Sequence, residues 1–201
     1  AVHLHIFNPR NDQLAWCAQR NISTTWEYVD SAVFAPAASN LLTAGGEGLR
    51  RTQVAIAKSN DLNIPQRMAK TYYACARFIR LREVHQSCST VFACDVDAVV
   101  RKPLPTLVTD FDLYIHQIFG AKARFLAGGL YLNSGAKSFL KAYADVLTSK
   151  IEQDQLYWSV DGQLPETLID WNMRPASVIW TAKGARKNNT AFTEEQKQYT
   201  A

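Results

Sequence analysis

The stretch STVFACDVDAVVRKPL, residues 89–104, poses the question on which the fold and function of this chain depend. It is apolar up to Cys94 and then carries two acids, Asp95 and Asp97, one residue apart. Side chains two positions apart in a strand point to the same face, so these carboxylates would lie side by side. Adjacent carboxylates repel each other unless a cation lies between them. The pattern favours a divalent metal site at a strand end, and a solvated turn is the alternative.

Length and composition limit the class of protein. A chain of 201 residues suits one domain, or one domain with a small appendage, and can bury a sizeable core. Its 47% hydrophobic and 20% charged residues are typical of a globular protein. The net charge of +4 mildly favours anionic ligands such as nucleotides. No dense Lys/Arg stripe indicates a nucleic-acid partner.

The cysteines and the apolar runs bear on the cellular setting. The four cysteines form no C-x-x-C pair and no zinc spacing, so we expect reduced, mostly buried thiols and a cytoplasmic location. No apolar run reaches 18 residues, so no membrane span is expected. The chain opens on Ala1-Val2-His3 without Met, and we expect it to be part of a longer polypeptide.

Alternating strand and helix patterns predict an α/β fold with a mixed, mostly parallel central sheet flanked by helices. Residues 35–65 are rich in Ala, Gly, Ser and Asn, and we expect an irregular excursion or lid there. In such folds ligands bind beyond the carboxyl ends of strands, where Asp95 and Asp97 are expected. The expected strands are residues 2–7, 24–29, 91–94, 112–117, 124–133, 167–173 and 176–180, with a pair of turns hinged on Gly128-Gly129 as the alternative for residues 124–133. The expected helices are residues 9–21, 66–86, 135–150 and 152–160.

A second D-x-D, Asp110-Phe111-Asp112, shows that the motif alone is weakly specific. The first pair follows a buried-type strand, whereas the second precedes a strand and is expected to start it or to contact solvent. We therefore assign the metal to Asp95 and Asp97 and treat the second pair as its internal control.

Several segments in order along the chain resemble glycosyltransferases of the GT-A fold, especially the glycogenin-like, retaining group. VFACDVDAVVRKPL resembles the metal-binding strand end of that family, and YYACARFIRLREV resembles its helix that carries an arginine toward the donor. RFLAGGLYLNSGAKSF looks like its N-A-G segment, EQDQLYWSV like its D-Q helix, and VIWTAKGARK like its closing H-x-x-G-x-x-K element. The resemblance covers roughly residues 66–190.

This resemblance implies a nucleotide-sugar transferase, with UDP as the expected nucleotide and Mn²⁺ or Mg²⁺ as the cofactor. The acceptor class (carbohydrate, protein or lipid) is left open. The divalent cation would neutralise charge on the departing diphosphate as a Lewis acid held by carboxylate oxygens. The implied residues are Asp95 and Asp97 for the metal, Arg77, Asp95, Gly184 and Lys187 for the donor, and Asp154 and Gln155, on a helix, for catalysis.

The chain departs from the family pattern at three points. Thr181 stands where the family has a metal-binding His, and a hydroxyl is a poor ligand. Leu126 replaces the Asn of N-A-G. Residues 2–7 resemble the family's second strand, so the first, nucleotide-contacting strand is expected to be missing. The expected organisation is one GT-A-like domain over residues 1–187 and a polar tail over residues 188–201.

Two other functions stay open at this point. FACDVDAVV also fits the D-x-D-x-[TV] motif of haloacid-dehalogenase-type phosphatases, with Asp95 as nucleophile and Asp97 as acid/base. The departures from the family would also suit a degenerate, non-catalytic domain that binds a sugar nucleotide or a partner protein. His3 and His5 alternate on the first strand, as metal ligands can, but we expect ordinary polar residues on a half-exposed strand.

Overall fold

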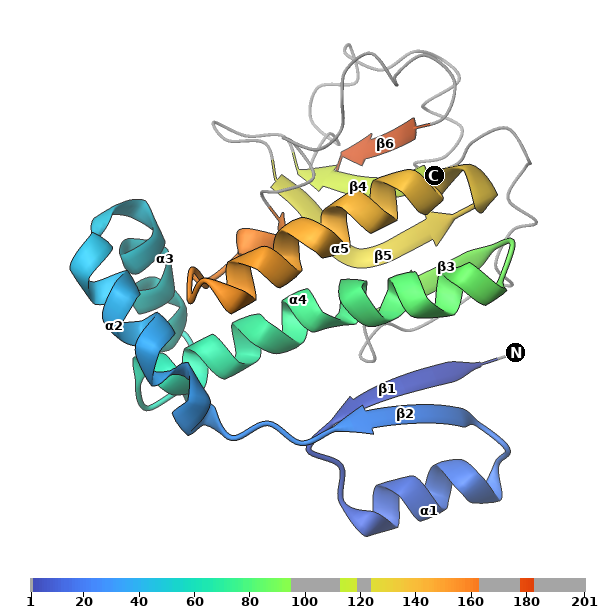
Figure 1. Ribbon diagram of the computed structural model, residues 1–201, viewed down its shortest axis with the longest axis horizontal. Helices are drawn as coiled ribbons and strands as arrows, with labels where there is room; N and C mark the ends of the chain where they lie inside the picture. The colour runs from blue at the N-terminus through green and yellow to red at the C-terminus, as the bar shows by residue number, and fades with distance from the viewer. Residues whose placement is uncertain (1, 95–112, 119–123, 163–177, 183–201) are drawn as a thin grey trace. The chain divides into compact units, whose positions relative to one another are not determined.

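The computed structural model describes residues 2–94, 113–118, 124–162 and 178–182. It confirms the α/β class (Figure 1). The chain divides into two compact units, one formed by Ala1–Arg80 with Leu147–Val160 and the other by Leu81–Val146 with Asp161–Ala201. Because α4 (Ile64–Ser87) and α5 (Lys137–Glu152) both cross this division, each contributes residues to both units.

The first unit begins with a β-α-β arrangement. Strands β1 (His3–Phe7) and β2 (Ser23–Glu27) pair in parallel, with His5 opposite Thr25. Parallel neighbours need a crossover connection, which α1 (Asn11–Gln19) supplies. The three elements follow the expected strand, helix and strand within two residues.

Residues 35–65 form two helices, so the expected irregular excursion is wrong. After the short 3₁₀ turn η1 (Ser31–Phe34), α2 spans Ala35–Ala44 and α3 spans Gly46–Ala57. Alanine is the best helix former, so the small residues here extend helices. Gly45 is the one residue between the two helices; it takes φ of +61°, and Gly46, the first residue of α3, takes φ of +69°.

Helix α4 confirms the expected long helix of residues 66–86 and extends it at the start. A reciprocal cap explains the earlier start: the backbone N–H of Gln66 donates to Asn63 Oδ1 at 3.0 Å, and the N–H of Asn63 donates to Gln66 Oε1 at 3.1 Å. On the expected apolar face Met68 and Cys75 are fully buried, whereas Tyr72 and Ile79 are half-buried.

The second unit holds a four-stranded sheet in the order β3-β5-β4-β6. β5 (Arg124–Leu132) pairs antiparallel with both β3 (Val91–Cys94) and β4 (Leu113–Ile118), and β6 (Val178–Ala182) pairs in parallel with β4. The described strands thus form two sheets with equal numbers of parallel and antiparallel pairings, so the expected mostly parallel sheet is not found among them. The expected strand at residues 167–173 lies outside the described residues.

Local periodicity also predicts the burial on α5. The expected inward positions Phe139, Leu140 and Tyr143 are 8%, 1% and 1% exposed in the second unit, and Leu147 is fully buried in the first. The described part of β5 is one continuous strand through Gly128 and Gly129 rather than a pair of turns.

Candidate functional site

Three of the four strands of this sheet have their carboxyl ends on the same side of the sheet. β3 and β4 both run antiparallel to β5, and β6 runs parallel to β4, so β3, β4 and β6 point the same way. Their last residues, Cys94, Ile118 and Ala182, therefore lie at the same end of the sheet, the end where β5 begins (Figure 1). Carboxyl ends of strands are the usual ligand-binding edge in α/β proteins.

Two of these strand ends lead directly into the residues that the sequence assigns to chemistry. Asp95 follows Cys94 at the end of β3, and Gly184 comes two positions after the end of β6. These residues themselves, Asp95, Asp97, Gly184 and Lys187, lie outside the described residues, as do Asp110 and Asp112.

The register adds one residue that the sequence analysis does not single out. His116 of β4 is the register partner of Thr181 in β6 and of Leu126 in β5, next to a bulge between Ile115 and His116. The two departures from the family pattern thus lie on either side of a histidine along the sheet. Only strand pairing could show this, because 65 residues separate His116 from Thr181.

Arg77, expected to reach the donor, is half-buried on α4 in the first unit. Its guanidinium carbon lies 4.7 Å from the ring centroid of Phe78, which is 1% exposed. Cation–aromatic packing of this kind helps to hold an arginine side chain in place. The expected contact with Asp95 or a donor stays a prediction.

The expected helix at residues 152–160, which was to carry Asp154 and Gln155, is wrong. α5 ends at Glu152 in a Schellman motif, with the N–H of Gln155 donating to Lys150 O at 2.8 Å and the N–H of Asp154 to Ile151 O at 3.1 Å. Asp154 takes φ of +53°, the left-handed region that stops a helix. It is half-buried in the first unit, whereas Gln155 is exposed and accepts from Lys150 Nζ at 3.0 Å.

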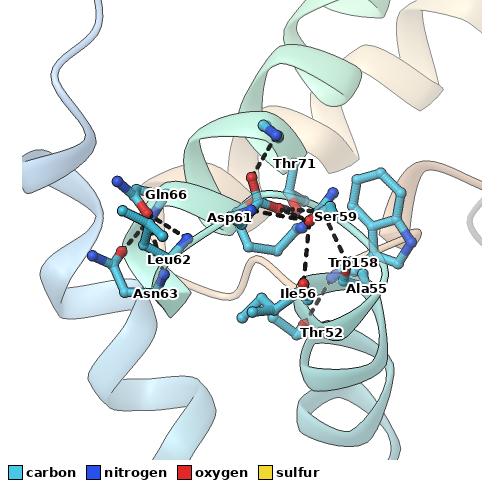
Figure 2. A network of polar contacts seen from close by, with 12 residues as sticks. Thr52, Ala55, Ile56, Ser59, Asp61, Leu62, Asn63, Gln66, Thr71 and Trp158 are labelled. Carbon is cyan, nitrogen blue, oxygen red and sulfur yellow. Dashed lines mark hydrogen bonds and ion pairs between the residues drawn. The ribbon is translucent and has the colours of Figure 1, made fainter.

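The structure also contains a buried polar network that the sequence reasoning missed (Figure 2). Figure 2 shows the side chain of Asp61, only 2% exposed, among Ser59, Thr71 and Trp158. Asp61 forms ion pairs with Arg67 and Lys70 and accepts from Ser59 Oγ at 2.7 Å. The network joins the loop after α3 to α4 within the first unit.

Charge pairing outweighs burial at Asp61. Burial alone would raise the pKa of its carboxyl, but hydrogen bonds from Lys70 and Ser59 and the charge of Arg67 hold it below the usual value. Arg67 is itself 6% exposed at its side chain and lies 4.4 Å from the Trp158 ring centroid. Because Asp61, Arg67 and Lys70 are joined in ion pairs with one another, we assign the network to stability and not to chemistry. A lone Asp in a polar loop gives no periodic signal that could have predicted its burial.

Searches for related proteins give no further constraint on the site. No family model, no curated protein and no solved structure matches this chain. Among the residues that the structure describes, no three His, Cys, Asp or Glu side chains converge as a metal site, and no helix there has both the length and the apolarity to cross a membrane. The fold family, the metal and the cytoplasmic location therefore stay predictions.

Proposed function

We propose that this chain is a metal-dependent glycosyltransferase that moves a sugar from a nucleotide-sugar donor, with UDP as the nucleotide, to an acceptor. One observation carries the proposal: β3 and β6 run in the same direction, so both strands finish at the same end of one sheet. The segments that resemble the metal-binding and diphosphate-binding elements of GT-A enzymes begin at those two strand ends. An acidic pair and a lysine element that are far apart in sequence thus start from the same end of one sheet, on strands that are separated by β5 and β4.

The proposed chemistry needs charge neutralisation more than covalent catalysis. A nucleoside diphosphate carries the negative charge when it leaves, and a divalent cation held by Asp95 and Asp97 supplies Lewis-acid stabilisation. Lys187 adds a positive charge at the diphosphate, and Gly184 allows backbone to approach it. Arg77 is assigned to donor binding. Asp154 and Gln155 are assigned to the sugar, by resemblance alone.

Thr181 is the weak point of the proposed metal site. Because its hydroxyl is a poorer ligand than imidazole, we expect low metal affinity without nucleotide and strong mutual dependence of metal and nucleotide.

To test the proposal, binding of UDP to the protein is measured by thermal shift and calorimetry, with and without Mn²⁺. We expect UDP to stabilise the protein only when Mn²⁺ is present, and Asp97→Asn to remove most of this effect because one anionic ligand is lost. Asp110→Asn is the matched control and should bind as the unmodified chain does. Equal losses in both variants would mean that the wrong acidic pair was chosen, and metal-independent binding would remove the metal role.

Turnover separates the remaining alternatives. Release of UDP from a UDP-sugar in the presence of Mn²⁺ supports a transferase. Metal-dependent UDP binding without any turnover across donors indicates the non-catalytic, degenerate domain. Hydrolysis of a phosphate monoester that is lost in Asp95→Asn indicates the phosphatase instead.

A further inference from the structure

One face of the β1–β2 sheet carries a continuous row of polar side chains. His3 Nδ1 lies 3.0 Å from Ser23 Oγ, and His3 Nε2 lies 3.0 Å from Thr25 Oγ1. His5 Nδ1 lies 2.8 Å from the same Thr25 oxygen. One ring nitrogen from each histidine therefore approaches a single hydroxyl group, on a part of the sheet where His3 and Thr25 are exposed.

The far end of the row determines where the hydrogens lie. His5 Nε2 is 3.1 Å from Glu27 Oε1, and an ionised carboxylate can only accept, so His5 Nε2 carries the hydrogen. His5 Nδ1 then presents a lone pair to Thr25, whose hydroxyl donates to it. This assignment follows from the hydrogen-bond network.

Glu27 is well held in this role. Tyr72 Oη of α4 donates to Glu27 Oε2 at 2.9 Å, and Arg80 Nη2 lies 3.4 Å from the same oxygen. Burial alone would raise the pKa of Glu27, but the hydrogen bonds from His5 and Tyr72 and the charge of Arg80 lower it below its usual value. Burial, followed by the hydrogen bond to Glu27 and the charge of Glu27, raises the pKa of Tyr72 to about 12. The phenol therefore keeps its hydrogen and remains a donor.

We propose that His3 Nε2 and His5 Nδ1 together bind one divalent transition-metal ion, with zinc as the representative. Metal-ligating imidazoles almost always donate their other ring N–H to an outer partner, which orients the ring and raises its basicity. His5 already donates to Glu27. His3 has Ser23 Oγ at 3.0 Å from Nδ1, so a change of tautomer frees its Nε2 lone pair and leaves Nδ1–H with an acceptor.

The chemistry of this site differs from that of the proposed acidic pair. Imidazole nitrogens suit zinc, nickel and copper, whereas carboxylate oxygens suit magnesium and manganese. In the described part of the chain no third His, Cys, Asp or Glu joins the two histidines. Water and the Thr25 hydroxyl fill the remaining positions, so the site is open to solvent.

The test is a Zn²⁺ titration followed by calorimetry and by the imidazole signals of the four histidines in NMR. We expect the His3 and His5 signals to shift, with the signal of buried His85 as the internal reference. His5→Gln and His3→Gln should each weaken Zn²⁺ binding at least tenfold. Glu27→Gln, which keeps the shape but loses the carboxylate, should weaken it by about 10–100-fold.

Thr25→Val and the fold controls complete the design. Thr25→Val keeps the side-chain shape and should leave Zn²⁺ binding within about threefold, because a hydroxyl is a weak ligand and water can take its position. Circular dichroism verifies that each variant folds, and only folded variants are compared. Unchanged Zn²⁺ binding in His5→Gln overturns the proposal. A Zn²⁺-dependent shift of the His3 signal without one of the His5 signal does so too, because the ion would then bind His3 alone.

Discussion

At the residue scale, His85 shows how burial in the folded state can make stability depend on pH. It is 1% exposed on the part of α4 that belongs to the second unit. Burial and the charge of Lys137 lower its pKa, and a backbone contact with Asn133 acts in the opposite direction. The folded state therefore holds the imidazole neutral at a pH where the unfolded chain would protonate it.

The sign of the pH effect follows from this lowered pKa. The unfolded chain binds a proton below about pH 6.5, and the folded chain does so only at lower pH, so stability falls as pH drops through this window. We expect a slope of up to about 1.4 kcal/mol per pH unit from this group. Urea denaturation between pH 7 and pH 5 measures it. In His85→Leu the slope should decrease by that amount, and an unchanged slope would assign the effect to other groups.

At the element scale, the end of α5 depends on one residue in a left-handed conformation. Asp154 has φ of +53° in a position that glycine usually occupies. Asp tolerates this region better than most residues, but alanine does not. We expect Asp154→Gly to be more stable than Asp154→Ala by about 1 kcal/mol in thermal unfolding. The reverse order would mean that Asp154 does not adopt this conformation in solution.

The same two variants separate structure from the proposed chemistry. Both lack the carboxylate, so if Asp154 faces the sugar, both should lose transferase activity whatever their stability. Activity that follows the stability order would instead assign Asp154 to the helix end alone.

At the scale of the whole molecule, two long helices connect the two compact units. α4 divides between Arg80 and Leu81, and α5 between Val146 and Leu147. Since each helix carries one hydrogen-bond ladder through the division, we expect the two units to unfold in a single cooperative transition.

Asp61→Asn tests this coupling from inside the first unit. It leaves Arg67, 6% exposed at its side chain, without its buried ionic partner, which typically costs about 3–5 kcal/mol. Hydrogen exchange should then become faster in β5 of the second unit as well as around Asp61. Asp145→Asn, at an exposed carboxylate paired with Arg82 and Lys141, is the matched control and should change little. Faster exchange confined to the first unit would mean that the units unfold separately.

The sequence by itself determined the elements whose signals are local. β1, β2, α4, β5 and α5 follow from side-chain periodicity, because alternation of faces in a strand and the recurrence of apolar residues in a helix are properties of neighbouring residues. The acidic pair after an apolar strand was visible for the same reason. The α2–α3 pair was missed because small residues were read as a loop, although alanine favours helix.

Only the tertiary structure decided the features that join distant residues. The residue pattern of one strand does not give its direction relative to other strands. That β3 and β6 finish at the same end of the sheet follows only from their pairing through β5 and β4. The convergence of His3 and His5 on Thr25 needs the parallel register of β1 with β2. The burial of Asp61 needs Arg67 and Lys70 from the next helix to offset its desolvation. Periodicity records which face a residue takes, whereas pairing and packing determine what it meets there.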